Sequence, residues 1–271
     1  MFCLNIRQLI ISVRYYFFVV IRNFLKKRFI PITLPFFTNQ IIFDKKNKKN
    51  IYIKIRDYTD WQTLSQVFYN EDYNLEKLTR FKGINKFYLE LIKNNKNPLI
   101  LDCGSHIGLA SRYFSETFPK SRIISLEPDR DNFKIGKKNN LNNNVEFMNA
   151  AIGSKNCYGN IVDPGLGKNS LRINFNGKKI IKITSINYIL KKLEKKIHPF
   201  IIKIDIEGSE HNLFSKNTEW INKFPILIIE LHDWMLPKTA NSKNFLRKIS
   251  SLNRDFLYYG ENIFSIKNNI I

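Results

Sequence analysis

Cysteine is scarce in this chain, and its placement excludes the usual cysteine-based scaffolds. The 271 residues contain three cysteines, Cys3, Cys103 and Cys157. An odd number without C-x-x-C spacing predicts neither a disulfide framework nor a structural zinc site. The four histidines also lack the spacing of metal ligands. We therefore expect a protein of a reducing, cytoplasmic compartment.

Acidic residues are few as well. The 23 Asp and Glu residues stand against 44 Lys and Arg, which gives a formal net charge of +21. A charge of this size is common in nucleic-acid-binding proteins. The lysines, however, occur in pairs along the whole chain, and the densest run, residues 45–49, is typical of a solvated loop. We therefore expect a generally basic surface and no nucleic-acid partner.

Long uncharged apolar runs are also missing, and none reaches the roughly 18 residues that a spanning helix needs. Residues 1–37 contain apolar stretches, but Arg7, Arg14 and Arg22 interrupt them. No small-residue cleavage pattern follows a short apolar core. The arginines fall on nearly one face of a basic amphipathic helix, which Pro31 would end. Such a helix either lies in a membrane interface or packs on the core with its arginines in solvent.

Length and composition predict one folded domain with appendages. A hydrophobic content of 44% and an aromatic content of 14% exclude wholesale disorder. After the segment 1–37, we expect a cap region over residues 38–96, with a strand at 51–55, and a main domain over residues 97–271. Two short strands near 171–175 and 179–183 are expected within an insert of the main domain.

Residues 98–108 are the most informative stretch. An apolar run ends at Asp102, Gly104 and Gly108 follow, and a helical pattern begins at Leu109. This order indicates a strand, a glycine-containing turn and a helix N-terminus in an α/β nucleotide-binding sheet. The spacing is D-x-G-x-x-x-G, whereas a dinucleotide site has G-x-G-x-x-G. An acid at this place suits S-adenosylmethionine, which carries an ammonium, a carboxylate and a sulfonium but no phosphate.

Further acids end the following apolar strands. Glu127 ends a second strand, 25 residues after Asp102, and would accept hydrogen bonds from both ribose hydroxyls. Its alternative role is to cap a helix that starts near Asp129. Asp205 and Glu207 end a third strand, and the apolar strand 225–231 repeats the design. Ligands of parallel sheets bind outside the carboxyl ends of the strands, and buried carboxylates are costly unless they are used or paired.

These units predict an α/β fold. We expect a doubly wound, mostly parallel, Rossmann-like methyltransferase sheet with helices on both faces and one reversed edge strand. The segments 256–259 and 263–266, around Gly260, are typical of a hairpin that closes the sheet.

The chain resembles the FkbM-type S-adenosylmethionine-dependent methyltransferases over roughly residues 55 to 235. Lys203-Ile-Asp-Ile-Glu-Gly-Ser-Glu210 is the most specific of the matching motifs. The others are Leu101-Asp-Cys-Gly-Ser-His-Ile-Gly108, Leu126-Glu-Pro128 with Asn132-Phe133, Asn149-Ala-Ala-Ile-Gly153 and Ile229-Glu-Leu-His232. Two positions depart from the family pattern: His106 stands where Asn is usual, and Asn187 where Asp is usual.

The resemblance implies methyl transfer, usually to a hydroxyl oxygen, often of a sugar or polyketide product. S-adenosylmethionine would be held by the turn from Asp102 to Gly108, with Glu127 on the ribose and Asn149 near the adenine. The predicted cofactor-binding residues are Asp102, Gly104, Ser105, His106, Gly108, Glu127 and Asn149. Arg56, Asp60 and Tyr73 match family positions that line the entrance, within the cap region 38–96.

Methyl transfer to an alcohol needs in-line placement of oxygen and methyl, and a base for the departing proton. Asp205 and His232 are the candidate bases, and Glu207 and Glu210 would orient the substrate, unless Glu210 only caps a helix. Our prediction includes no metal. The alternative is a divalent ion held by Asp205, Glu207 and Glu230, an arrangement that some other O-methyltransferases use.

The predicted acceptor is a hydroxyl on a glycan, glycolipid precursor or related small molecule at the cytoplasmic membrane face. The family tendency suggests the sugar, and the helix in residues 1–37 suggests peripheral contact with the inner membrane. Two other functions stay open: a nicotinamide-dependent oxidoreductase, and a non-catalytic basic adaptor on membranes or RNA.

Overall fold

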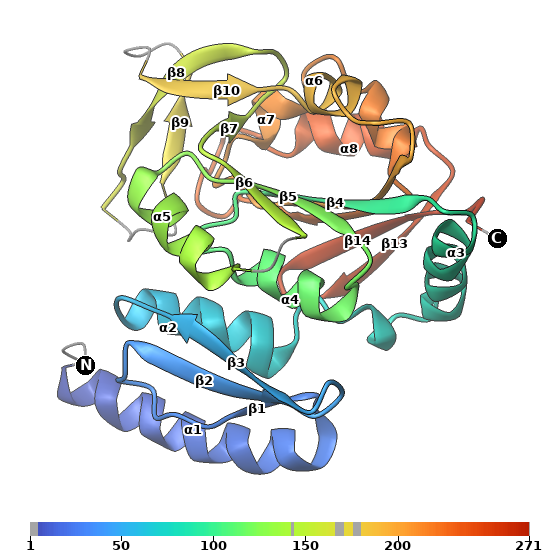
Figure 1. Ribbon diagram of the computed structural model, residues 1–271. Helices are drawn as coiled ribbons and strands as arrows, with labels where there is room; N and C mark the ends of the chain where they lie inside the picture. The colour runs from blue at the N-terminus through green and yellow to red at the C-terminus, as the bar shows by residue number, and fades with distance from the viewer. Residues whose placement is uncertain (1–4, 142–143, 166–170, 176–179, 271) are drawn as a thin grey trace.

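A seven-stranded sheet forms the centre of the molecule (Figure 1). The computed structural model describes residues 5–141, 144–165, 171–175 and 180–270. The strand order is β13-β14-β12-β11-β4-β5-β6. The bounds are β4 (Asn97–Cys103), β5 (Arg122–Leu126), β6 (Val145–Met148), β11 (Ile197–Ile204), β12 (Ile226–Glu230), β13 (Arg254–Tyr259) and β14 (Asn262–Lys267).

The predicted mostly parallel sheet is confirmed. Strands β6, β5, β4, β11 and β12 are mutually parallel, and β14 runs antiparallel to β12. The predicted hairpin is formed by β13 and β14. Because the hairpin reverses direction again at Gly260, which has φ +60°, the edge strand is β13 and the reversed strand is its inner neighbour.

Helices cover both faces of this sheet, as expected for a doubly wound fold. One face carries α3 (Phe81–Lys93) and α4 (Leu109–Thr117), and the other carries α6 (Ile186–Lys191), α7 (Glu210–Leu213) and α8 (Lys243–Ser250). Along β4, Ile100 belongs to the first apolar core, whereas Leu99 and Leu101 belong to the second. A central parallel strand is buried on both faces, which explains its continuous apolar sequence. The elements α5 (Arg130–Asn139) and η3 (Glu219–Lys223) complete this domain.

The N-terminal part forms a smaller layer. Strands β1 (Phe29–Pro31), β2 (Asn39–Asp44) and β3 (Lys49–Lys54) make an antiparallel sheet, which confirms the strand expected at 51–55. Helix α1 (Ile6–Lys26) precedes them, and α2 (Tyr58–Leu64), η1 (Ser65–Asn70) and η2 (Leu75–Lys77) follow. The prediction that Pro31 ends the helix was wrong, because α1 ends at Lys26 and Pro31 lies opposite Ile42. Proline is tolerated there because β1 is an edge strand.

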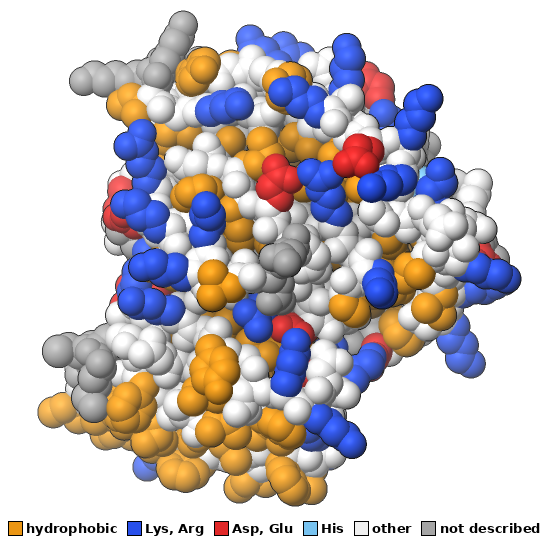
Figure 2. All heavy atoms as spheres, in the orientation of Figure 1, with side chains coloured by type: hydrophobic (Ala, Val, Ile, Leu, Met, Phe, Trp, Pro, Cys, Tyr) orange, Lys and Arg blue, Asp and Glu red, His pale blue; other side chains and the backbone are white. Residues whose placement is uncertain are grey.

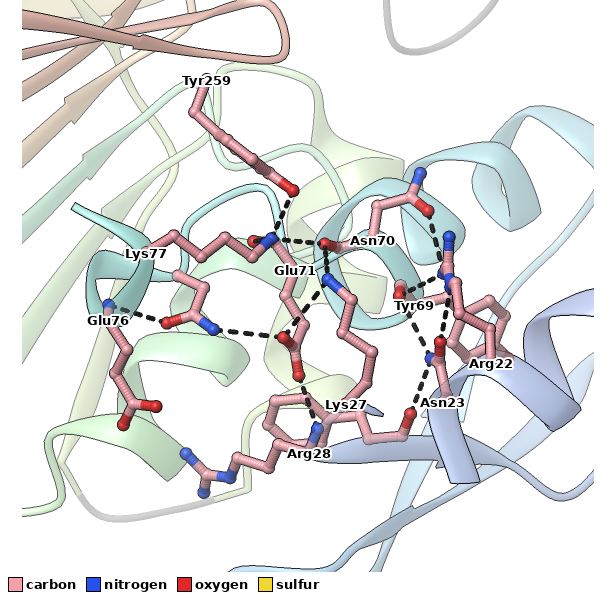
Figure 3. A network of polar contacts seen from close by, with 12 residues as sticks. Arg22, Asn23, Lys27, Arg28, Tyr69, Asn70, Glu71, Glu76, Lys77 and Tyr259 are labelled. Carbon is pink, nitrogen blue, oxygen red and sulfur yellow. Dashed lines mark hydrogen bonds and ion pairs between the residues drawn. The ribbon is translucent and has the colours of Figure 1, made fainter. Parts of the chain in front are cut away.

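Polar side chains attach α1 to η1 (Figure 3). The amide of Asn23, fully buried, donates to the carbonyl oxygens of Phe29 at 2.8 Å and Tyr69 at 3.1 Å. Arg22 also donates to the Tyr69 carbonyl at 2.7 Å, and Lys27 donates to the Asn70 carbonyl at 2.9 Å. The last turn of the helix is therefore fixed to the carbonyl end of η1.

A second small sheet is inserted between β6 and β11. It has the order β7-β10-β8-β9, with β7 (Ala151–Ile152), β8 (Cys157–Val162), β9 (Arg172–Asn174) and β10 (Ile181–Thr184). Strands β9 and β10 match the two short strands expected in the insert; Lys179, the first residue of the second one, lies outside the described residues, as does Cys3.

Candidate active site

A cavity of about 430 Å³ opens at the carboxyl ends of the central strands. Its lining comes from the turns after β4, β5, β11 and β12, from the β13–β14 turn, from the N-terminal layer and from β9. Six predicted site residues line it: Gly104, His106, Glu127, Asp205, Glu207 and His232. Four others, Asp102, Ser105, Gly108 and Asn149, are not among the lining residues. The structure therefore brings the predicted acids together at one rim but leaves Asp102 beneath it.

Asp102 lies behind the turn. Its carboxylate is fully buried and accepts a hydrogen bond from the Ser111 hydroxyl at 2.7 Å. Gly104 has φ +81°, and a Cβ on it would lie 1.7 Å from the carbonyl oxygen of Asp205. Glycine is required here because the turn after β4 touches the end of β11.

Lys203 links the two strand ends from below. Its buried ammonium donates to the Gly104 carbonyl at 2.7 Å, and lies 3.3 Å from Asp102 and 3.2 Å from Asp205. Burial lowers the pKa of Lys203, but the two carboxylates outweigh it and raise the pKa well above its ordinary value. The residue was not predicted as functional, although a single lysine within an apolar strand was the available signal.

Glu127 is buried at the end of β5 and faces the cavity. The backbone N–H groups of His106 and Asp129 donate to its two oxygens, at 2.9 Å and 3.0 Å. Burial raises the pKa of Glu127 to about 8, against the effect of these bonds. The side chain of Asp129 caps α5, so Glu127 is not the capping residue. Asn149 donates to the carbonyl oxygen of Glu127 and to that of Pro128, and so supports the same turn.

His106 connects the cofactor turn to the N-terminal layer. Its Nε2 lies 3.1 Å from an oxygen of Asp60, which also pairs with Arg56 at 2.8 Å. Burial raises the pKa of Asp60, but the bonds from Arg56 and His106 dominate and hold it well below its usual range. Arg56 and Asp60 thus fix the turn, and Tyr73 lines the cavity itself.

His232 lies among carboxylates. Its Nε2 is 3.5 Å from Asp205, 3.6 Å from Glu207 and 3.5 Å from Glu230, and its Nδ1 is 2.9 Å from Glu210. Burial lowers the pKa of His232, but the bond to Glu210 and the surrounding acids outweigh it and raise the pKa to about 9. The imidazole therefore carries a positive charge at neutral pH.

The acids around His232 differ in ionisation. Burial, followed by the charge of Asp205, raises the pKa of Glu207 to about 7 and that of Glu230 to about 8. Burial acts in the same sense on Asp205, but Lys203 and His232 lower its pKa overall. Asp205 is thus a fixed anion, whereas Glu207 and Glu230 exchange protons near neutral pH.

Glu210 does not face the cavity. It is fully buried, accepts from Asn241 and His232, and fixes the ring of His232 from behind. Asp205, Glu207 and His232 each offer one ligand atom, and these atoms lie within 4.8 Å of one another. Such a group has the composition of a divalent metal site, with Glu210 holding the histidine in place.

Residues 102–258 match the FkbM methyltransferase domain. This span covers more than half of the chain and contains the strand ends that build the cavity. The chain belongs to the FkbM methyltransferase family. It is a methyltransferase, and its cofactor is S-adenosylmethionine.

Several solved structures match parts of this chain at low identity. A putative O-methyltransferase from Klebsiella pneumoniae is 12% identical, over 75% of this chain and 89% of that one, with a TM-score of 0.40. An O-methyltransferase from Bacillus cereus in complex with SAH is 14% identical, over 79% and 92%, with a TM-score of 0.40. These similarities are too low to carry a functional argument. No curated protein has a sequence that matches this FkbM methyltransferase.

The cavity residues fit S-adenosylmethionine. The Oε1 atom of Glu127 accepts from the Asp129 N–H and, at 3.4 Å, from the Asn132 amide. Its Oε2 atom accepts only the His106 N–H among the described residues and keeps a further lone pair for a ribose hydroxyl. Leu126, Pro128 and Ile152 give an apolar wall beside it, which suits an adenine ring. The turn at Gly104, between Glu127 and Asp205, is left for the methionine part.

Proposed function

We propose that this FkbM methyltransferase methylates a hydroxyl oxygen of a sugar or glycan. The observation that carries the proposal is the pair Glu207 and Glu230, two cavity-lining carboxylates beside a charged histidine. A hydroxyl becomes a good nucleophile only as it loses its proton, and a base whose pKa is close to the working pH accepts that proton best. Amide side chains at Gln62 and Gln66, also in the lining, suit the many hydroxyls of a sugar.

S-adenosylmethionine supplies the methyl group on a positively charged sulfur. Glu127 accepts hydrogen bonds from the ribose hydroxyls, and the Gly104 turn orients the reacting end. Glu207 accepts the proton of the acceptor hydroxyl. Before this transfer, the positive charge of His232 stabilises the carboxylate of Glu207. Asp205, held by Lys203, orients the acceptor. Of the three predicted catalytic residues, Glu207 thus acts as the base, while Asp205 and His232 position the substrate and the base.

The proposal is tested on surface glycans. Cells that lack the protein, cells with the native chain and cells with Glu207→Gln are compared by mass spectrometry of their glycans. We expect one sugar to lose a methyl mass without the protein, and Glu207→Gln to lower the methylated fraction, since a general base contributes about 10²–10⁴-fold. Glu146→Gln, an exposed substitution on β6, is the control. Unchanged glycans, with the missing methyl on a secreted metabolite, would contradict the proposal.

The metal version of the mechanism is tested separately. If Glu207 acts as a base without a metal, labelled methyl transfer in cell extract continues after EDTA treatment and dialysis. Loss of transfer, restored by Mg²⁺ or Mn²⁺, would instead assign Asp205, Glu207 and His232 to an ion.

We further propose that α1 rests on the cytoplasmic face of a membrane. Its inward side carries Ser12, Tyr16, Val19 and Asn23, whereas its outward side is apolar: Phe17, Ile21 and Leu25 are 58%, 65% and 70% exposed. Figure 2 shows hydrophobic side chains gathered along the lower edge of the molecule, over α1. Arg7 and Arg14 are exposed on the same helix. An apolar face with adjacent cations suits an anionic lipid surface.

Among the described residues, α1 is the one helix long and apolar enough to span a bilayer by length and composition. Signal sequences and core helices of soluble proteins pass the same criterion. The contacts of Asn23 and Lys27 with the folded domain support an in-plane position, because they hold the helix along β1 and η1.

Vesicle sedimentation tests this location. The double substitution Phe17→Asp and Ile21→Asp would release the protein from vesicles that contain anionic lipid. Leu246→Asp on α8, at the opposite end of the molecule, changes an apolar side chain that is 49% exposed and would leave binding intact. Equal binding by all three proteins would contradict the membrane proposal without affecting the methyl transfer.

A further inference from the structure

The charge of the cavity is opposite to that of the protein. The chain has a formal net charge of +21. Yet the described residues that line the cavity include six carboxylates and no lysine or arginine, and the cation among them is His232. Those carboxylates belong to Asp72, Glu127, Asp205, Glu207, Glu230 and Glu261. Because basic residues are in excess over the chain as a whole, the concentration of carboxylates in the cavity is a local property of this site.

The strand order separates the acids into two groups. Glu127 and Gly104 follow β5 and β4, the half of the cavity that fits the cofactor. Glu207 follows β11, Glu230 ends β12 and Glu261 follows β13, on the other side of β4 in the sheet. Glu230 is paired in register with Asn262, the neighbour of Glu261. These acids therefore surround the space that remains for the acceptor.

Asp72, which belongs to the N-terminal layer, is the remaining acid of this group. Its carboxylate lies next to Gly260, where a Cβ would be 3.9 Å from the carboxyl carbon of Asp72. Gln66 donates to Glu261 at 3.4 Å across the same gap. Asp72 and Glu261 thus both lie beside the β13–β14 turn, close enough for the charge of Glu261 to act on Asp72.

Three basic residues close to the cavity are bound to other groups, whereas Arg172 lies against the cavity-lining Met235 and its buried Nε has no hydrogen-bond partner among the described residues. Lys203 lies beneath it with Asp102 and Asp205. Lys77 donates to the carbonyl oxygens of Asn70 and Glu71 and to the hydroxyl of Tyr259, as Figure 3 shows. Arg56 is paired with Asp60. Burial raises the pKa of Asp72 to about 6, and the nearby charges of Lys77, Lys27 and Arg22 act against this effect, but no lysine or arginine is among the described residues that line the cavity.

An aromatic ring accompanies the acids. Trp234, four residues after the end of β12, lines the cavity and is 73% exposed, so its ring is open to an incoming molecule. Tryptophan is the aromatic residue that attracts ammonium groups most strongly through its ring face. Carboxylates with an open tryptophan ring are a combination that binds an organic cation, and they repel phosphate and sulfate.

We propose that the acceptor enters the cavity with a protonated amine, held by Asp72, Glu230 and Glu261, while its reactive hydroxyl lies toward Glu207. This rests on the proposed transfer to a sugar hydroxyl and narrows the acceptor to an amine-bearing sugar or glycan end. Sugars that carry phosphate near the reactive hydroxyl are excluded by the same charges.

Saturation-transfer NMR tests the charge preference directly, with the full chain saturated with S-adenosylhomocysteine. The probes are three forms of one ring: glucosamine, N-acetylglucosamine and N-acetylglucosamine 6-phosphate. One ion pair at a partly buried site is worth about tenfold in affinity. We therefore expect glucosamine to bind about tenfold more tightly than N-acetylglucosamine, and the phosphate form to give no signal.

Two variants test whether Asp72 and Glu261 cause the preference for glucosamine. The double variant Asp72→Asn with Glu261→Gln should lose most of the preference for glucosamine, and the exposed control Glu146→Gln should keep it. Affinity for S-adenosylhomocysteine, measured by calorimetry, reports whether each variant is folded. Equal binding of the three probes, tighter binding of the phosphate form or no glucosamine signal would each overturn the proposal.

A divalent ion is the other cation that carboxylates attract, and a separate titration distinguishes it. Glucosamine preference that persists in EDTA supports the amine. Binding of the phosphate probe that appears only with Mg²⁺ would overturn it, because the ion would then be the charge partner. This experiment measures binding alone, so it is independent of the glycan masses. Methylation of a neutral sugar would contradict the proposal of an amine-bearing acceptor but would leave the proposal of O-methylation intact.

Discussion

At the scale of single residues, the site is a set of buried charges in which the innermost ones are paired. Lys203 is bound by Asp102 and Asp205, and His232 by Glu210. Burying an unpaired charge is expensive, and the cost falls only when partners are supplied in good geometry. For the acids that face the cavity, Glu207 and Glu230, burial and then the charge of Asp205 raise the pKa to about 7 and about 8, so their protons are exchangeable near neutral pH.

Gly104 is the residue whose replacement should matter most for the backbone. Gly104→Ala places a Cβ 1.7 Å from the Asp205 carbonyl and retains φ +81°, so two strand ends must move. We expect the free energy of unfolding to fall by more than the 1–3 kcal/mol that left-handed backbone costs by itself, roughly. Urea unfolding measures it.

Gly165→Ala is the matched control, because Gly165 has φ +78° and nothing within 4 Å. Its cost should be limited to the backbone term of about 1–2 kcal/mol. Equal losses for the two variants would show that the contact with Asp205 is unimportant.

Glu127 should make cofactor affinity depend on pH. Its pKa in the free protein is raised to about 8, by burial, so the carboxylate that accepts the ribose hydroxyls is mostly protonated below that pH. Affinity for S-adenosylhomocysteine should therefore rise with pH and level off above pH 8, by up to about tenfold per unit. Calorimetry between pH 6 and pH 9 is the measurement, roughly spanning the titration of this group.

The raised pKa of Glu127 also makes the stability of the protein depend on pH. A carboxyl whose folded pKa exceeds its unfolded value contributes stability that is complete below the unfolded pKa and is lost as pH rises through about 8. Glu127→Gln should remove both effects: flat cofactor affinity and a smaller loss of stability toward pH 8. A slope that is unchanged in this variant would assign the pH dependence to another group.

At the scale of elements, α1 is attached by polar contacts on its inner side. Asn23→Ala removes three hydrogen bonds, two that its amide donates to the carbonyl oxygens of Phe29 and Tyr69 and one that its oxygen accepts from Arg22. The two carbonyl oxygens are then left with fewer donors. We expect a loss of about 1–3 kcal/mol in the free energy of unfolding. Urea unfolding followed by tryptophan fluorescence reports it, since Trp61 of α2 packs against Tyr15.

Lys26→Ala, at an exposed position of the same helix, should change stability little and serves as the control. If Asn23→Ala is equally silent, α1 is held by its apolar contacts, such as buried Val19, rather than by these hydrogen bonds.

At the scale of the whole molecule, cofactor choice distinguishes this protein from an oxidoreductase of similar architecture. Ligand at 100 times its Kd stabilises the folded state by about 2.7 kcal/mol. S-adenosylhomocysteine should therefore raise the Tm by roughly 5–10 °C for a chain of this size. NAD at the same concentration should give no shift, because the first turn lacks the G-x-G-x-x-G pattern of a dinucleotide site. A shift with NAD alone would refute the cofactor assignment.

The sequence by itself determined the parallel sheet and the family. Apolar runs such as 99–103 and 200–204, each followed by an acid, are local signals, and short-range periodicity is enough to read them. The sequence also indicated that Asp205, Glu207 and His232 lie at one edge of the sheet, because parallel strands end on the same side.

Only the tertiary structure decided how those residues divide their tasks. Asp102 and Asp205 share Lys203, and Glu210 turns away from the cavity toward His232, since these contacts join β4, β11 and β12 across long stretches of chain. Asp72 and Glu261 are 189 positions apart and meet because η1 packs near the β13–β14 turn. Charge and burial at such contacts depend on distance in space, which spacing along the chain does not contain.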